Sequence, residues 1–309
     1  MNLCLVGLGN HGLGVILPSI INSKSKLIAT VSSKDHEINK KYNIKNYKSL
    51  SSATRILNKN TVFVLTTPPQ IHERQIINLM SKGYSIIVEK PSILNKKYYF
   101  KYIELKNHKN FVFENFMYFE TKLFESFIKI FSQKNLKINE LIINFCIPKF
   151  PNNSFRNELD IIDVLVFDLC CYPVSLITQL FDFKEIPNIN LRVLKKNYRY
   201  SLNLKINKIN IKIKFGISQN YQNNCILNTL NKKIKFNYFF YGKKKLKQIS
   251  IKNKNENKFL PYKEVYDLDT FSKIFSQPKN FFFKNELNKK KAKTNFFFLN
   301  KILDLCKDS

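Results

Sequence analysis

Four of the seven glycines in this chain lie within eight residues, directly behind a short apolar run at residues 3–6. They are Gly7, Gly9, Gly12 and Gly14, and an apolar helical pattern follows them. In a G-x-G-x-x-G turn the first glycine lets the chain turn off a strand, the second lets backbone N–H groups approach a pyrophosphate, and the third lets the helix pack closely on the strand. The order of strand, glycines and helix therefore predicts a dinucleotide-binding turn at a helix N-terminus, with a ligand-free glycine turn as the alternative.

Short apolar runs alternate with helical patterns through the first 115 residues, which is typical of a parallel sheet wound with helices. The predicted strands are residues 2–6, 27–32, 61–66, 85–89 and 110–114. The predicted helices lie near residues 12–22, 48–57, 70–82 and 95–107. We therefore expect residues 1–115 to form an α/β Rossmann domain with a doubly wound parallel sheet.

The pattern changes after residue 115. Strands dominate from residue 186 to about residue 252, and two segments between residues 202 and 215 alternate apolar with polar side chains, as half-exposed antiparallel strands do. A helical pattern returns at residues 296–306. We expect residues 116–309 to form an α+β domain with an open, mostly antiparallel sheet, whose last helix packs back on the first domain.

The chain is strongly basic, with a formal net charge of +30 and a pI near 9.8. Only five of its 52 basic residues are arginine, and the lysines are scattered along the whole sequence apart from short runs at residues 243–247 and 289–293. Nucleic-acid recognition favours the bidentate guanidinium of arginine. We therefore expect solvated lysine faces and no nucleic-acid partner, although a basic surface attracts anionic substrates.

Cysteine and histidine usage excludes several kinds of site. The six cysteines show no C-x-x-C pairing, and the four histidines, His11, His36, His72 and His108, all lie in the first 108 residues. This distribution predicts no metal site and favours a reducing compartment. No apolar run approaches the length of a membrane span, and the chain opens into a strand, so we expect a cytoplasmic protein without a membrane partner.

Two further segments end neighbouring strands of the predicted sheet. Glu89-Lys90-Pro91 follows the fourth strand, and Thr66-Thr67-Pro68 follows the third, with His72 shortly after it. Parallel sheets bind ligands at the carboxyl ends of their strands, where both segments would lie. Together with the glycine turn, these segments resemble the Gfo/Idh/MocA family of NAD(P)-dependent oxidoreductases. The resemblance implies that Lys90 lies beside the nicotinamide and that the T-x-P segment lines the cofactor cleft.

The resemblance continues beyond the first domain. Glu114-Asn115-Phe116-Met117 is similar to the E-[AN]-F-M segment of branches that act on sugars, diols and nucleotide-linked keto-sugars. Phe155-Arg156 and the later segment 167–176 are similar to the family's F-R…D-[IL]-G-x-Y-P-[IV]-S-L stretch. The resemblance implies catalytic roles for Asp168 and Tyr172, which lie four residues apart and would share one helix face. The alternative is an N-cap aspartate and a packing tyrosine.

The chain departs from the family pattern at one place. Where the family has a glycine-rich loop and a later glycine, this chain has Ile162-Asp163-Val164 and Cys170. Bulkier side chains there would narrow the substrate pocket. A non-catalytic cofactor-binding protein therefore stays open as an alternative function.

The expected chemistry is hydride transfer assisted by a proton donor. The side chains of lysine and tyrosine have pKa values of about 10.4 and about 10, and a cation beside the phenol favours its ionised form. We expect Tyr172 to act as general acid, Lys90 to polarise the carbonyl, and Asp168 to orient substrate or lysine. His72 is expected to pack at a helix start rather than to catalyse.

The cofactor preference follows from the end of the second strand. An NAD-specific site places a carboxylate about 20 residues after the glycines, whereas this chain has Ser32-Ser33-Lys34, which suits a 2′-phosphate. NADP(H) is therefore expected, and Asp35 keeps NAD(H) as the alternative. The residues expected to contact the cofactor are Gly7, Gly9, Asn10, His11, Gly12, Ser32, Ser33, Lys34, Thr66, Thr67, Pro68, His72, Glu89, Lys90 and Asn115.

The sequence thus predicts an NADP(H)-dependent oxidoreductase that transfers hydride between nicotinamide and a sugar or nucleotide-sugar ketone or alcohol. A diol or inositol-type dehydrogenase is a second possibility within the enzymes. The expected partner is a small sugar-like substrate. Since family members pair through the open sheet, the resemblance implies a homo-oligomer.

Overall fold

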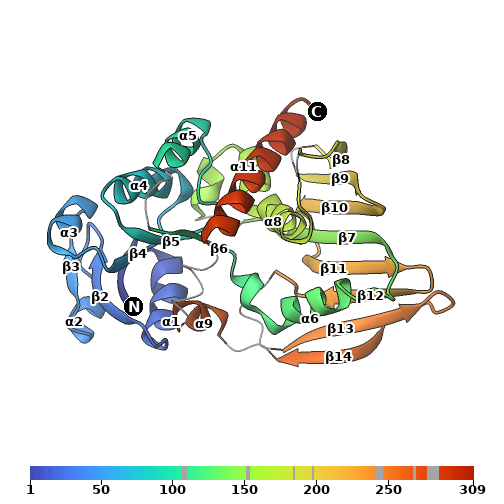
Figure 1. Cartoon of the computed structure of the whole chain (residues 1–309), viewed down its shortest axis with the longest axis horizontal. Helices are drawn as coiled ribbons and strands as arrows, with labels where there is room; N and C mark the ends of the chain where they lie inside the picture. Colours follow the sequence, from blue (N-terminus) through green and yellow to red (C-terminus); the bar gives the residue numbers. More distant parts are fainter. Residues whose placement is uncertain are drawn as a thin grey trace. The chain divides into compact units, whose positions relative to one another are not determined.

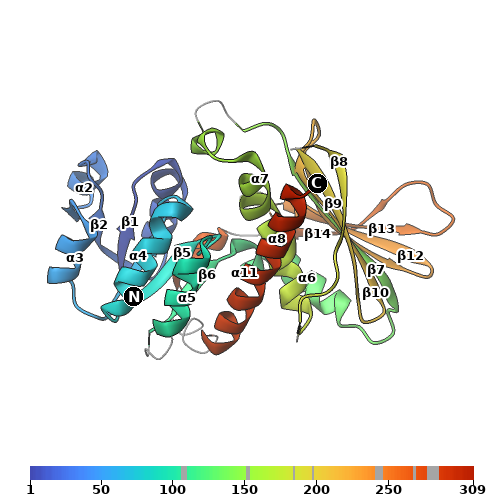
Figure 2. The same cartoon turned by 90° about the horizontal axis from the view of Figure 1, so that it is seen from above.

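The computed structural model describes residues 1–105, 110–150, 154–183, 185–196, 198–240, 246–266, 269–276 and 285–309. It divides into two compact units (Figures 1 and 2). The first unit comprises residues 1–116 and 271–292, and the second comprises residues 117–270 and 293–309. Three sequence features, His108, the end of the helix predicted at 95–107 and the lysines at 243–245, lie outside the described residues.

The first unit contains a six-stranded parallel sheet in the order β3-β2-β1-β4-β5-β6. Its strands are β1 (Asn2–Val6), β2 (Lys26–Val31), β3 (Lys45–Tyr47), β4 (Thr61–Leu65), β5 (Ser85–Glu89) and β6 (Val112–Asn115). The central strands are apolar and buried because helices cover both faces, with α1 on one and α4 and α5 on the other (Figure 1). This confirms the predicted doubly wound Rossmann sheet, whose strand order reverses between β1 and β4.

The helices of the first unit follow the strands in turn. They are η1 (Gly12–Ile16) with α1 (Leu17–Ile21), α2 (Glu37–Lys41), α3 (Leu50–Ile56), α4 (Pro69–Ser81) and α5 (Lys96–Glu104). The late helix α9 (Thr270–Ser276) returns to this unit, where the Ser272 hydroxyl donates to the Ser19 carbonyl oxygen at 3.0 Å. The sequence did not predict α2 and β3, because both are short and mostly polar.

The second unit contains an eight-stranded sheet in the order β14-β13-β12-β11-β7-β10-β9-β8. Every neighbouring pair is antiparallel except β7 with β10, which confirms the predicted open, mostly antiparallel sheet. Its strands are β7 (Ile138–Ile147), β8 (Asn190–Lys195), β9 (Arg199–Ile206), β10 (Ile209–Ile217), β11 (Gln222–Thr229), β12 (Lys232–Asn237), β13 (Leu246–Asn253) and β14 (Leu260–Tyr266).

Helices pack on one face of this sheet (Figure 2). They include α6 (Lys122–Phe131) and a continuous helix formed by α7 (Ile161–Val164), η5 (Leu165–Cys170) and α8 (Cys171–Leu180). Phe127 of α6 meets Phe236 of β12 with ring centroids 5.1 Å apart. The remaining short helices are η3 (Met117–Glu120) and η4 (Phe155–Glu158).

The continuous helix Ile161–Leu180 corrects one expectation. Among the described residues, it is the one helix long and apolar enough to span a membrane, although the sequence showed no run that approaches this length. The helix is 78% buried inside the structure. Burial on the sheet and under the C-terminal helix accounts for its apolar composition without a membrane.

The C-terminal helix α11 (Asn285–Lys307) packs within the second unit from residue 293 onward. The Thr178 hydroxyl donates to Asn295 Oδ1 at 2.6 Å, and Lys307 Nζ lies 2.7 Å from Asp163 Oδ1. The first residues of this helix, 285–292, belong to the first unit, on which the sequence predicts that the last helix packs back. A helical pattern predicts an apolar face but not the surface that covers it.

Candidate functional site

The glycine turn has the geometry that a bound pyrophosphate requires. Gly7 has φ +94°, which favours glycine, and a Cβ on Gly12 would collide with the Gly7 carbonyl oxygen. A Cβ on Gly9 would instead meet no atom within 4 Å, so open space lies above the turn. Asn10 and His11 are exposed where the following helix begins. The residues present therefore fit a phosphate group at a helix N-terminus.

The T-x-P segment is joined to this turn by hydrogen bonds. The Thr66 hydroxyl donates to the Gly7 carbonyl oxygen at 2.6 Å, and the Thr67 hydroxyl donates to Gln75 Oε1 at 2.7 Å. The Thr66 bond brings together the T-x-P segment and the glycine turn, two segments that the sequence placed at one sheet edge. Both hydroxyls have protein acceptors, so their direct effect is to shape the turn. Pro68 is half-buried immediately before α4.

His72 is fully buried between the T-x-P and E-K-P segments. Its Nδ1 lies 2.9 Å from the Thr67 carbonyl oxygen, and its Nε2 lies 2.8 Å from the Pro91 carbonyl oxygen. Both nitrogens face backbone carbonyl oxygens, which is the arrangement expected of a packing residue at the start of α4, and the contact of His72 with the cofactor stays a prediction. Burial lowers its pKa, while the two carbonyl oxygens and the charge of Glu89 oppose that shift.

Lys90 is half-buried at the end of β5 and precedes a cis peptide bond to Pro91. The segment after it is held by Glu114 of β6, whose Oε1 accepts from the Ser92 N–H at 2.7 Å. Burial raises the pKa of the Glu114 carboxyl, and the Ser92 hydrogen bonds and the Lys90 charge oppose that shift. A β6 carboxylate therefore supports the turn that carries Lys90, a role that the sequence did not assign.

Asn115 presents an unused acceptor beside Glu89. Its Nδ2 donates to Glu89 Oε1 at 2.7 Å, and His11 Nε2 lies 3.6 Å from the same oxygen. Asn115 is 1% exposed, and its Oδ1 has no hydrogen-bond partner among the described residues. A buried carbonyl oxygen without a donor is costly, so this atom fits a ligand N–H such as that of a carboxamide.

The end of β2 leaves hydroxyls and a cation exposed. Ser33 and Lys34 are exposed, and Ser32 is half-buried with its hydroxyl 3.2 Å from His36 Nε2. Asp35 Oδ2 lies 2.5 Å from Lys48 Nζ. The hydrogen bond from Lys48 is the main reason why the pKa of the Asp35 carboxyl is lowered.

In the second unit, Asp168 forms an ion pair with Arg156. Arg156 Nε donates to Asp168 Oδ2 at 2.6 Å, and both side chains are partly exposed. Asp168 lies in the middle of the continuous helix, so the alternative that it is an N-cap is wrong. The cap is Asp160, whose Oδ1 accepts from Ile162 N–H at 2.9 Å and from Asp163 N–H at 3.0 Å.

Tyr172 lies in an aromatic cluster and is 7% exposed. Its ring centroid is 4.9 Å from that of Phe145 and 5.6 Å from that of Phe240, while its hydroxyl points to Met117 Sδ at 3.9 Å. A thioether is a weak acceptor. This packing gives the ring a structural role and leaves the hydroxyl weakly engaged by that neighbour.

The residues that depart from the family pattern are helical here. Ile162, Asp163 and Val164 form α7, and Cys170 is 0% exposed in the helix interior. Burial raises the pKa of the Cys170 thiol. The Cys170 side chain therefore occupies the core of the second unit.

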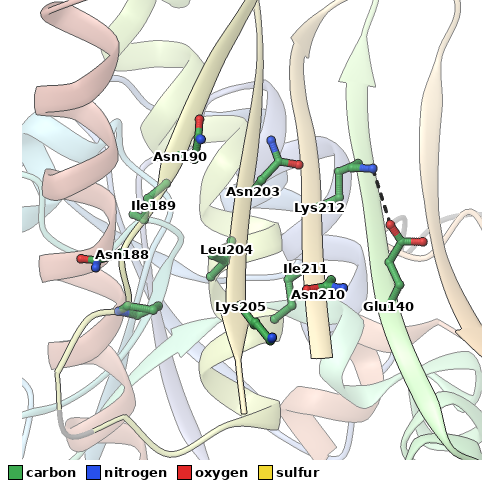
Figure 3. Close-up of a pocket in the computed structure, with 11 residues that line it drawn as sticks. Glu140, Asn188, Ile189, Asn190, Asn203, Leu204, Lys205, Asn210, Ile211 and Lys212 are labelled. Carbon is green, nitrogen blue, oxygen red and sulfur yellow. Dashed lines mark ion pairs between the residues drawn. The ribbon is translucent and has the colours of Figure 1, made fainter. Parts of the chain in front are cut away.

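A separate groove lies on the second unit's sheet (Figure 3). Its volume is about 760 Å³, and polar side chains of β7, β9 and β10 line it, with Lys212 Nζ 3.5 Å from Glu140 Oε1. No predicted site residue lines this groove. Within the described ranges, no group of three His, Cys, Asp or Glu side chains is arranged to hold a metal ion.

Comparison with known proteins identifies the first unit. Residues 1–116 match the family GFO_IDH_MocA, described as an oxidoreductase family with an NAD-binding Rossmann fold. No curated protein matches the chain.

Solved structures share the whole fold at low sequence identity. A tyrosine-to-phenylalanine mutant of the 3-ketoreductase KijD10 of Actinomadura kijaniata, in complex with TDP-benzene and NADP, has a TM-score of 0.80 at 12% identity, covering 98% of this chain and 96% of its own. UDP-N-acetylglucosamine 3-dehydrogenase GnnA of Acidithiobacillus ferrooxidans has a TM-score of 0.71 at 10% identity, covering 97% and 99%. The aldose-aldose oxidoreductase of Caulobacter crescentus has a TM-score of 0.78 at 12% identity, covering 97% and 98%.

Proposed function

We propose that the chain is an NAD(P)-dependent oxidoreductase of the Gfo/Idh/MocA type, whose Rossmann fold residues 1–116 match, and that it uses NADP(H) to interconvert a ketone and an alcohol on a sugar or nucleotide-sugar. The observation that carries this proposal is the open space above Gly9, beside a helix N-terminus in a sheet of Rossmann order. The unpaired Oδ1 of buried Asn115 adds a hydrogen-bond acceptor for a ligand in the same unit.

The substrate class rests on the likeness of the whole chain to the structures of a 3-ketoreductase and of a nucleotide-sugar dehydrogenase. The NADP preference rests on Ser33 and Lys34, which are exposed after β2, and on the occupied carboxylate of Asp35. The NADP in the KijD10 complex agrees with this preference.

In the proposed reaction the nicotinamide supplies or accepts the hydride, and the protein holds and protonates the substrate. Lys90 polarises the carbonyl as a cation at the end of β5. Tyr172 is the proposed general acid, because the segment 167–176 that carries it resembles the family's D-[IL]-G-x-Y-P-[IV]-S-L stretch. Asp168, held by Arg156, is proposed to orient the substrate or the lysine.

One set of observations favours a second candidate, a non-catalytic cofactor-binding protein. Tyr172 is packed among aromatic rings, and Asp168 is already neutralised by Arg156. Each of these side chains thus has a structural partner that explains its position. The two candidates share cofactor binding and differ in turnover.

The experiment is a fluorescence titration of the wild-type protein with NADPH and NADH, followed by an NADPH oxidation assay. The assay panel contains free keto-sugars and TDP- and UDP-linked keto-sugars. Tight NADPH binding with turnover of one panel member supports the proposed enzyme. Tight binding without turnover across the panel, in both reaction directions, supports the second candidate.

The quaternary state and cellular location are also proposals. We infer a homo-oligomer that works in the cytoplasm on a small sugar-like substrate, without nucleic-acid or membrane partners. Sedimentation equilibrium tests for the homo-oligomer. At physiological salt, co-sedimentation with anionic vesicles tests for membrane binding, and co-sedimentation with duplex DNA tests for nucleic-acid binding. A monomer, or binding to the vesicles or to the DNA, would contradict the corresponding inference.

A further inference from the structure

We propose that Asn46 and Lys48 determine the cofactor preference by occupying both oxygens of the Asp35 carboxylate, which leaves the loop after β2 to a 2′-phosphate. Asn46 Nδ2 donates to Asp35 Oδ1 at 2.9 Å, and Lys48 Nζ lies 2.5 Å from Asp35 Oδ2. The inference rests on the proposed use of NADP(H). It adds two specificity-determining residues, both from the region of β3 (Lys45–Tyr47), which pairs in parallel with β2 (Figure 1).

The orientation of Asn46 is determined by the core of the first unit. Its Oδ1 accepts from the hydroxyl of Thr30 at 3.0 Å, and Thr30 is 0% exposed. The Thr30 hydroxyl in turn accepts from Asn39 Nδ2 at 2.7 Å. The Thr30 hydroxyl has a single proton, which it donates to Asn46 Oδ1 while its oxygen accepts from Asn39. The Asn46 amide nitrogen therefore faces the opposite way, toward the loop.

Three acceptors of the loop surround that nitrogen. They are the carbonyl oxygens of Ser32 at 3.2 Å and Lys34 at 3.1 Å, and Asp35 Oδ1 at 2.9 Å. The loop backbone and the Asp35 side chain are thus held by one amide. Because this network reaches the buried Thr30, the loop keeps its shape before a ligand binds.

Lys48 acts through charge rather than through stability. The Lys48 and Asp35 side chains are 57% and 70% exposed, and exposed pairs contribute little to folding. The ammonium nevertheless cancels the one carboxylate of the loop, and the pKa of Asp35 is lowered accordingly. His36 and Lys34 are the other charged or titratable side chains of this loop.

A free carboxylate in this loop would have the opposite effect on the two cofactors. It would accept a hydrogen bond from the ribose 2′-hydroxyl of NAD(H) and repel the 2′-phosphate of NADP(H). With both oxygens of Asp35 occupied, the exposed Ser33 hydroxyl and Lys34 ammonium remain as donors. Removing Lys48 should therefore leave the charge of the carboxylate uncompensated and shift the preference toward NADH.

The test is a double-mutant cycle of Lys48→Met and Asp35→Asn on the full chain, with the Kd of NADPH and NADH measured by fluorescence titration. We expect Lys48→Met to raise the Kd of NADPH about tenfold and to lower that of NADH. Asp35→Asn alone should change NADPH binding less than about threefold. Adding Asp35→Asn to Lys48→Met should restore NADPH binding, because no carboxylate then remains to repel the phosphate. Asn46→Ala should shift the two Kd values in the same directions as Lys48→Met.

An equal loss of NADPH affinity on Lys48→Met with and without Asp35→Asn would overturn the inference, because it would mean that Lys48 binds the phosphate itself. Tighter binding of NADH than of NADPH by the wild-type protein would instead contradict the proposed NADP(H) function. Melting temperatures of all variants check that the fold is kept. Since Lys48 and Asp35 are exposed, we expect these temperatures to stay close to that of the wild type.

Discussion

His72 Nε2 lies 2.8 Å from the carbonyl oxygen of Pro91, and this contact joins α4 to the turn that follows Lys90. On its other side, Nδ1 faces the carbonyl oxygen of Thr67 at 2.9 Å. A neutral imidazole donates from one ring nitrogen, whereas a protonated imidazole donates from both. The ring thereby connects the T-x-P segment to the turn that follows Lys90, the lysine predicted to act in catalysis.

Replacing His72 with Phe should keep an aromatic ring and remove both ring nitrogens. We expect the free energy of unfolding to fall by about 2 kcal/mol, because the buried carbonyl oxygen that accepts from the neutral ring's N–H loses its donor. The pKa of His72 is lowered from 6.5, so the stability that it contributes is present above that value and is lost as pH falls through it. Denaturant unfolding between pH 5 and about 8 should show this slope in the wild type only. An unchanged slope in the variant would contradict this account of the ring.

The strands of the first unit could be predicted because their apolar runs are bounded by polar or glycine residues. The predicted bounds of β1 and β5 match the structure. The α2 helix and β3 strand could not be predicted, since a polar five-residue helix and a three-residue strand carry no hydrophobic period. The role of Lys90 was predicted from its motif. The support given by Glu114 depends on the order of the strands and leaves no local signal in the sequence.

The second unit was harder to predict at its site. Asp168 and Tyr172 came from family resemblance, and spacing alone could not reveal the pairing of Asp168 with Arg156. Likewise, the contact of Asn46 with Asp35 joins residues from two elements and follows only from the folded register of β2 with β3. Side-chain networks of this kind need coordinates, because sequence patterns encode burial rather than partners.

Gly9 and Gly14 offer a matched pair of substitutions. A Cβ at either position would meet no atom within 4 Å, so neither change should strain the fold. Gly9→Val should raise the Kd of NADPH at least tenfold, because the side chain would fill the space above the turn. Gly14→Val should leave the Kd nearly unchanged. Equal affinities of the two variants in fluorescence titrations would place the phosphate elsewhere.

Lys90→Met should separate binding from catalysis. The change removes the cation and keeps an unbranched chain of similar length. We expect nearly unchanged NADPH affinity and a turnover lower by roughly two to four decades, the scale of a lost acid–base or polarising group. Steady-state kinetics on an identified substrate gives both quantities. Near-full activity of the variant would refute the catalytic assignment of Lys90.

Tyr172→Phe and Asp168→Asn distinguish catalysis from packing in the second unit. Tyr172→Phe keeps the ring among its aromatic neighbours, so the melting temperature should not change. A proton-donor role predicts a rate lower by roughly two to four decades, while a packing role predicts full activity. Asp168→Asn should lower the melting temperature in either case, because Arg156 loses its carboxylate. A turnover loss that Asp168→Glu partly restores would assign Asp168 an additional role in catalysis.

The most direct test of the central claim follows the hydride itself. The wild-type protein is incubated with NADPH deuterated at the transferring carbon and with each keto-sugar of the panel, and the products are analysed by mass spectrometry. The account predicts a sugar alcohol that carries deuterium on the former carbonyl carbon, and far less of this product from Lys90→Met in the same time. Tight NADPH binding without deuterium in any sugar of the panel would contradict the claim that this chain reduces sugar ketones.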